Sequence, residues 1–69
     1  MKVAVVRFAN SGHVEAFATM AQADARAKDA GATCFDSVDR NVRTYYENKA
    51  DMKVAESIVC MVDFVEVES

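Results

Sequence analysis

The chain has 69 residues, of which 52% are apolar, with no proline and only two glycines. This is the length of one small domain, and the composition excludes a disordered chain. Eight basic and eleven acidic side chains leave a formal net charge of −3, which argues against a general nucleic-acid binder and against attraction to an anionic membrane.

The first residues are not expected to act as a signal peptide or a membrane span, because Arg7 interrupts their apolar run too early. We therefore expect a cytoplasmic protein, in the host cell if the chain is phage-encoded. In that reducing compartment Cys34 and Cys60 are expected as free thiols. Two separated cysteines and one histidine supply too few ligands for a metal site, so neither a metal nor a cofactor is expected.

Residues Val3 to Phe8 predict the first strand, because the run is nearly continuous in apolar residues and ends at a turn signal. That signal is Asn10-Ser11-Gly12, whose Asn and Gly tolerate positive φ angles. The following HVEAFA predicts a second strand that pairs back on the first. A single long helix from Val14 to Ala30 is the alternative.

The main helix is predicted over residues 20–30. Thr19 stands three residues before Gln22, a capping-box pattern, and Gly31 lies where a C-terminal cap is expected. The segment is rich in alanine, which favours helix. Its predicted sheet-facing residues are Met20, Ala23, Ala27 and Ala30.

Residues 37–51 are compatible with two structures. Ser37 is a candidate N-cap, and Val38, Val42 and the tyrosines match helical spacing. Against this second short helix, NVRTYYE is rich in strand-forming residues and is followed by a turn signal. We favour a strand over residues 41–47.

The final strand is predicted over Ser57 to Val67. One face carries Ile58, Cys60, Val62 and Phe64, and the other is also apolar except for Asp63. A strand that is apolar on both faces is either central in a layered structure or covered by a partner. With only one clear helix, the chain has little material for a second covering layer.

The predicted fold class is therefore α+β. It is a small antiparallel sheet of three to four strands packed against one main helix, with a second short helix as the alternative for residues 37–51. Residues 1–69 form a single domain.

No residue set predicts catalysis. His13 is the sole histidine, and a general base needs an orienting carboxylate and a nucleophile within reach. Ser11 and Glu15 are near in sequence, but their position at a turn is typical of residues that serve local geometry. We therefore predict that the protein is not an enzyme.

Two groups of residues are candidates for partner binding. The first is basic and aromatic, and although these residues also suit single-stranded nucleic acid, the surrounding acids favour protein contact. The second lies in an acidic C-terminal segment that suits a basic partner surface, although solubilising charge also explains it. The candidates are Arg40, Arg43, Tyr45 and Tyr46 in the first group, and Glu56, Asp63, Glu66 and Glu68 in the second.

Half of the chain resembles small phage-encoded inhibitors in layout, certain anti-CRISPR proteins among them. The segments concerned are KVAVVRF, VEAFATMAQADARA and Thr33-Cys34-Phe35. The resemblance implies a non-enzymatic inhibitor that binds a host defence or nucleic-acid-processing complex, and it assigns no functional residues. The expected function is thus a protein-binding module. A self-associating, dimeric structural or regulatory domain is the alternative.

Overall fold

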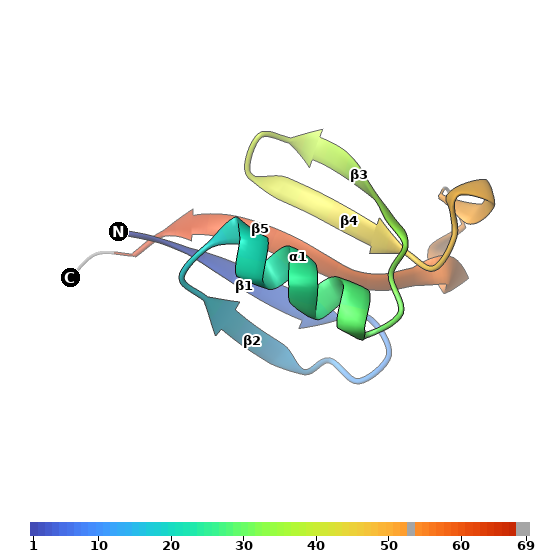
Figure 1. Ribbon diagram of the computed structural model, residues 1–69, viewed down its shortest axis with the longest axis horizontal. Coiled ribbons are helices and arrows are strands. Elements are labelled where there is room, and N and C mark those ends of the chain that lie inside the picture. Colours follow the sequence, from blue (N-terminus) through green and yellow to red (C-terminus); the bar gives the residue numbers. More distant parts are fainter. Residues whose placement is uncertain (53, 68–69) are drawn as a thin grey trace.

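One antiparallel sheet with a single covering helix makes up the fold in the computed structural model, which describes residues 1–52 and 54–67 (Figure 1). The strand order is β2-β1-β5-β4-β3, and every neighbouring pair is antiparallel. The elements are β1 (Lys2–Phe8), β2 (Val14–Phe17), α1 (Met20–Asp29), β3 (Cys34–Asp39), β4 (Val42–Tyr46), the 3-10 turns η1 (Lys49–Asp51) and η2 (Ala55–Ser57), and β5 (Ile58–Glu66).

The α+β prediction is wrong. Strands make up 48% of the structure and helices 22%, so this is a small mostly-β fold. The sheet has five strands in the described residues instead of three to four, and α1 is their single α-helix. The additional strand is β3, whose signal is weak in the sequence because an edge strand exposes most of its side chains.

The N-terminal hairpin forms as predicted, and the alternative of one long helix from Val14 is wrong. Gly12 has a φ of 70° in the turn, a conformation that favours glycine. The amide of Phe8 donates to the carbonyl of His13 at 2.9 Å, and the amide of Gly12 donates to the carbonyl of Phe8 at 3.0 Å. These bonds close the hairpin and set the register of β2 on β1.

The predicted capping box begins helix α1. The Thr19 hydroxyl accepts from the amide of Gln22 at 3.2 Å, and the Gln22 side chain accepts from the amide of Thr19 at 3.3 Å. Gly31 follows the helix with a φ of 108°. Ala23 and Ala27 are fully buried against the sheet, whereas Ala30 is exposed, contrary to the prediction. The small alanine side chains let the helix approach the strands closely.

The strand predicted over residues 41–47 is confirmed as β4, and the second helix is absent from the described part of residues 37–51, where β3, β4 and a 3-10 turn lie instead. The strand predicted over residues 57–67 is confirmed as β5. Its pairing with β4 shifts between Tyr45 and Tyr46, so that Tyr45 lies opposite Cys60 but Tyr46 opposite Ile58. The irregularity removes Ile58 from the face predicted for it, while Cys60 and Val62 remain buried together.

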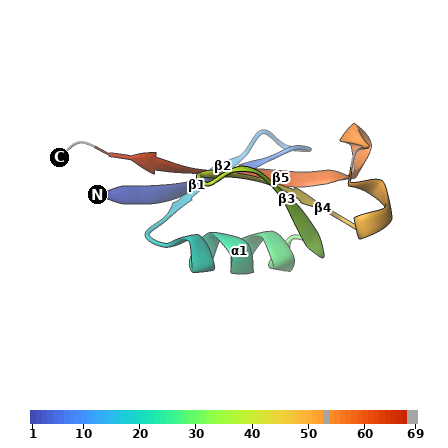
Figure 2. The same ribbon diagram turned by 90° about the horizontal axis from the view of Figure 1, so that it is seen from above.

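The hydrophobic core lies between α1 and one face of the sheet (Figure 2). Its fully buried residues come from the helix, from the central strand β5 and from its neighbours β1 and β4. They are Ala4, Val6, Ala23, Ala27, Tyr45, Cys60 and Val62. The helix therefore covers one face of the sheet, and the other face has no covering layer within the described residues.

Candidate functional site

The face of the sheet opposite α1 is not covered by any helix or strand of the described residues (Figure 2). Successive side chains of a strand point to opposite faces. Because Ala4 and Val6 of β1 are buried under the helix, the residues between and beside them point to the uncovered side. The antiparallel register carries this assignment across the sheet. We call this surface the open face. Its residues are Val3, Val5, Arg7, Val14, Ala16, Val42, Thr44, Met61, Asp63 and Val65.

Apolar side chains dominate the open face. Val3 lies opposite Val65, and Arg7 lies between Val14 and Met61. The exposed fraction is 52% for Val14, 42% for Met61 and 39% for Val65. An antiparallel sheet with one solvated face usually alternates apolar and polar residues, but the outward positions of β1 and β5 are largely valine and methionine.

Two opposite charges interrupt the apolar surface. Asp63 is half-buried at its centre, opposite Val5 on one side and Val42 on the other. Arg7 is exposed and lies one strand away and two residues along, so the two charges are diagonal neighbours. Neither forms an ion pair within the residues that the structure describes.

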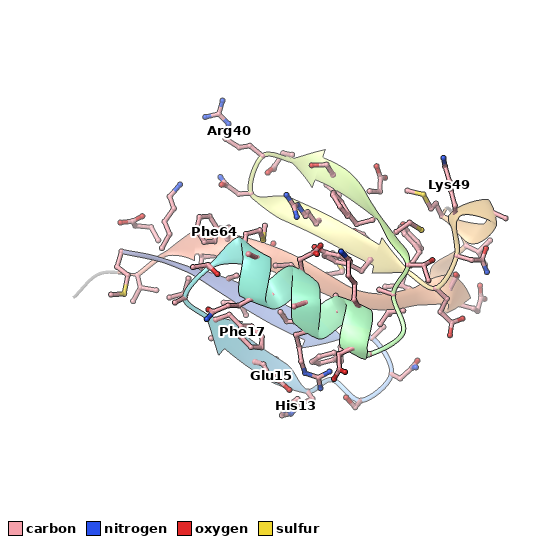
Figure 3. All side chains as sticks on the ribbon, viewed as in Figure 1. His13, Glu15, Phe17, Arg40, Lys49 and Phe64 are labelled. Carbon is pink, nitrogen blue, oxygen red and sulfur yellow. The ribbon has the colours of Figure 1, made fainter. Side chains whose placement is uncertain are left out.

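The basic and aromatic candidates do not gather on one surface. Arg40 is exposed at the turn between β3 and β4 and points away from the body of the protein (Figure 3). Arg43 lies on the helix side, where its guanidinium is 4.4 Å from the ring of Phe35. Tyr45 is buried in the core, and Tyr46 is 8% exposed. Arg43 and Tyr45 therefore have structural partners on the helix side.

The acidic candidates are also separated. Glu56 is exposed in η2, and Asp63 lies on the open face. Glu66 accepts a hydrogen bond from the N-terminal ammonium group at 3.0 Å. Glu68 lies outside the described residues. Of the seven candidates within the described residues, Asp63 is the one whose charged side chain belongs to the apolar open face.

On the helix side, a polar network joins α1 to β4. The Tyr45 hydroxyl donates to Asp24 at 2.7 Å, and Lys28 forms an ion pair with the same carboxylate at 3.0 Å. Burial acts to raise the pKa of Asp24, but the hydrogen bonds from Tyr45 and Lys28 outweigh it and the pKa is lowered. Burial raises the pKa of Tyr45. This network fixes the helix on the sheet.

A second network joins α1 to β2. Arg26 donates to Glu15 at 3.1 Å and lies 4.7 Å from the ring of Phe8. The hydrogen bond from Arg26 lowers the pKa of Glu15. His13 contacts the same carboxylate at 3.1 Å, and the two side chains lie together below β2 in Figure 3. The Ser11 hydroxyl accepts from the backbone amide of His13, as in a turn.

A hollow of about 430 Å³ lies beside the C-terminal end of α1. Lys28 and Lys49 border it, and Phe35 and Tyr45 contribute aromatic surface.

Within the described part of the chain, no three His, Cys, Asp or Glu side chains are grouped so that they could hold a metal ion. No helix there is long and apolar enough to cross a membrane.

Comparisons with protein-family models, curated proteins and solved structures find no match for this chain. The resemblance in layout to small phage inhibitors therefore stays a prediction. The assignment of the open face as a candidate site rests on the strand register and on the burial of the side chains.

Sequence reasoning missed Arg7 as part of this surface, because it treated the residue only as an interruption of an apolar run. A signal for it does exist. In KVAVVRF, simple alternation puts Arg7 on the same face as Val3 and Val5. Alternation along β1 does not indicate which strand lies beside it. In the structure that strand is β5, which brings Met61 and Asp63 next to Arg7.

Proposed function

We propose that the protein is a non-enzymatic protein-binding module and that the open face is its docking surface. The observation that carries this proposal is the uncovered apolar surface of two adjacent interior strands, β1 and the central strand β5. Their outward positions hold Val3, Val5, Met61 and Val65, where a solvated antiparallel sheet normally places polar residues. Contiguous exposed apolar patches are uncommon on soluble monomers and mark interaction sites.

The composition of the surface adds support. Apolar residues on neighbouring strands surround Arg7 and Asp63, and neither charge forms an ion pair within the residues that the structure describes. A protein partner suits this combination, since interfaces have an apolar centre with a few oriented polar groups. The net charge of −3 favours a partner with basic groups.

The proposed partner belongs to one class of complexes. On the resemblance in layout to phage-encoded inhibitors, the partner is a host defence or nucleic-acid-processing complex in the host cytoplasm. A basic surface on such a complex would face the acidic side chains of this chain. Self-association is the second candidate function, and it is favoured by the two opposite charges of the open face.

The test compares two single substitutions that add the same charge at exposed positions. Val65→Glu places a carboxylate on the open face, and Ala25→Glu places one on the outer side of α1. Tagged wild-type protein and both variants are used for affinity capture from a cell lysate at low salt, and circular dichroism verifies the fold. We expect Val65→Glu to lose the protein contacts that the wild type and Ala25→Glu retain. If the wild type and both variants capture lysate proteins equally and also self-associate equally, the open face is excluded as a docking surface.

A further inference from the structure

We propose that the open face binds a second copy of the same chain, packed face to face about a two-fold axis that pairs Arg7 of each copy with Asp63 of the other. This inference rests on the proposed function, because it takes the open face as a protein-docking surface and names its occupant.

Asp63 restricts what can cover the open face. Its carboxylate is half-buried between Val5 and Val42, at the centre of an otherwise apolar region. Covering an unpaired carboxylate with apolar groups carries a large desolvation cost. An occupant that brings a cation over Asp63 avoids this cost. An anion on the same occupant would also pair with Arg7, which has no ion-pair partner in the described residues.

A second copy meets both requirements at the correct spacing. In a two-fold interface the same patch faces itself, so a contact from Arg7 to Asp63 is repeated in the opposite direction. The required axis runs between the two sheets and parallel to them. It is perpendicular to the line from Arg7 to Asp63 and passes over the midpoint of that line. Rotation by 180° about it then places Arg7 of the second copy over Asp63 of the first, and Asp63 of the second copy over Arg7 of the first. One placement of the axis thus forms both ion pairs.

The same axis predicts how the two sheets cross. Arg7 and Asp63 are separated by one strand spacing and by two residues along the strand. With strands about 4.8 Å apart and a rise of about 3.3 Å per residue, the strands of the two copies cross at roughly 70°, nearer to orthogonal than to aligned sheet packing. Val3, Val5, Met61 and Val65 then surround the paired charges with apolar contact.

The crossing angle limits the area that two copies can bury. The molecule measures 40 × 23 × 17 Å along its principal axes, and the view down the shortest axis shows the sheet face-on (Figure 1). The sheet therefore spans the two longer dimensions. Because the two sheets cross at roughly 70°, they overlap over about the 23 Å width of each copy, roughly 560 Å² per partner. This is smaller than a standard interface of about 800 Å² on each partner and corresponds to a dimer that forms at high protein concentration.

The experiment is a charge exchange read out by molar mass. Sedimentation equilibrium of the wild type, from about 1 µM to about 500 µM, is compared with Arg7→Asp, Asp63→Arg and the double variant that carries both changes. Arg40→Asp is the matched control, because it makes the same charge reversal at an exposed turn away from the open face. Circular dichroism verifies that each variant is folded.

We expect the wild type and Arg40→Asp to reach twice the monomer mass of 7.6 kDa. Each single reversal at Arg7 or Asp63 should weaken dimerisation by at least about tenfold, because it brings like charges together, and the double exchange should restore it. A wild-type monomer over the whole range would overturn the inference. Single reversals without effect, or a double exchange that fails to restore the dimer, would overturn the Arg7–Asp63 pairing.

The outcomes separate this inference from the function on which it rests. A monomeric wild type whose capture of another protein is lost in Val65→Glu contradicts the dimer and keeps the docking surface. A Val65→Glu substitution that changes neither the molar mass nor the capture contradicts both.

Discussion

The hydroxyl of Tyr45 donates a 2.7 Å hydrogen bond to the carboxylate of Asp24, which joins β4 to α1 across 21 residues of sequence. Tyr45 is 1% exposed, so its ring fills the core while its hydroxyl reaches the polar rim of the helix. The bond explains how a tyrosine that appears in the sequence as a surface candidate becomes a structural residue.

Removing this hydroxyl should destabilise the protein. Tyr45→Phe keeps the buried ring but deletes a hydrogen bond to a charged group, so we expect a loss of about 1–2 kcal/mol in the free energy of unfolding, measured by urea denaturation. Tyr46→Phe is the matched control, since the Tyr46 hydroxyl has no hydrogen bond within the described residues and its loss should change stability less. Equal effects of the two substitutions would contradict the assigned role of the Asp24 contact.

Asp24 should make stability depend on pH. Because its pKa is lower in the folded chain than in the unfolded chain, its contribution is fully present above the unfolded value and is lost as the pH falls through the folded value. The difference in unfolding free energy between wild type and Asp24→Asn should therefore be largest at neutral pH and shrink below about pH 4. Urea denaturation at a series of pH values measures it. The carboxylate of Glu15 is present in both proteins and cancels in the difference. A difference that is constant with pH would refute the prediction.

The two faces of β5 should respond differently to the same substitution. Val62 is fully buried under α1, whereas Val65 is 39% exposed on the open face. We expect Val62→Ala to cost about 2 kcal/mol, from the lost burial of two methyl groups and the cavity that remains. Val65→Ala should cost less than about 0.5 kcal/mol in the monomer. Thermal and urea unfolding at equal protein concentration provide the comparison, and the reverse order would show that the core lies on the other face.

The two thiols should react at different rates. Cys60 is fully buried, and burial raises the pKa of its thiol to about 11, so little of the reactive thiolate is present. Cys34 is half-buried at the end of the sheet. With a thiol reagent such as Ellman's reagent, the native protein should show one accessible thiol, and the second should react only after unfolding in denaturant. Cys34→Ser removes the accessible thiol and identifies the slow one. Rapid modification of Cys60 in that folded variant would rule out its place in the core.

Features that depend on neighbouring residues were predictable. The capping box at Thr19 and Gln22 forms within one helical turn, and the hairpin turn at Gly12 needs only a short segment with a positive φ. The long apolar run of the last strand also identifies β5 without knowledge of its partners. The sequence missed β3 because an edge strand exposes polar residues, so that its burial pattern is hard to distinguish from a loop or a helix start.

The candidate site was predictable in part. Apolar residues on both sides of the last strand indicated a surface that requires cover, and α1 does cover only one side of the sheet (Figure 2). The sequence assigned Arg43 and Tyr45 to partner binding, but their side chains lie on the helix side, where they contact Phe35 and Asp24. Alternation along a strand indicates which residues share a face, and it does not indicate which face the helix will cover.

The sequence by itself therefore determined the helix, four of the strands and the presence of excess apolar surface, because each arises from local propensity and periodicity. The tertiary structure decided that the first and last strands are neighbours, which brings Arg7 and Asp63 together from positions 56 residues apart. The pairing of β1 with β5 depends on the free energy of the whole sheet, because the sheet joins segments that are distant along the chain. No local pattern contains it.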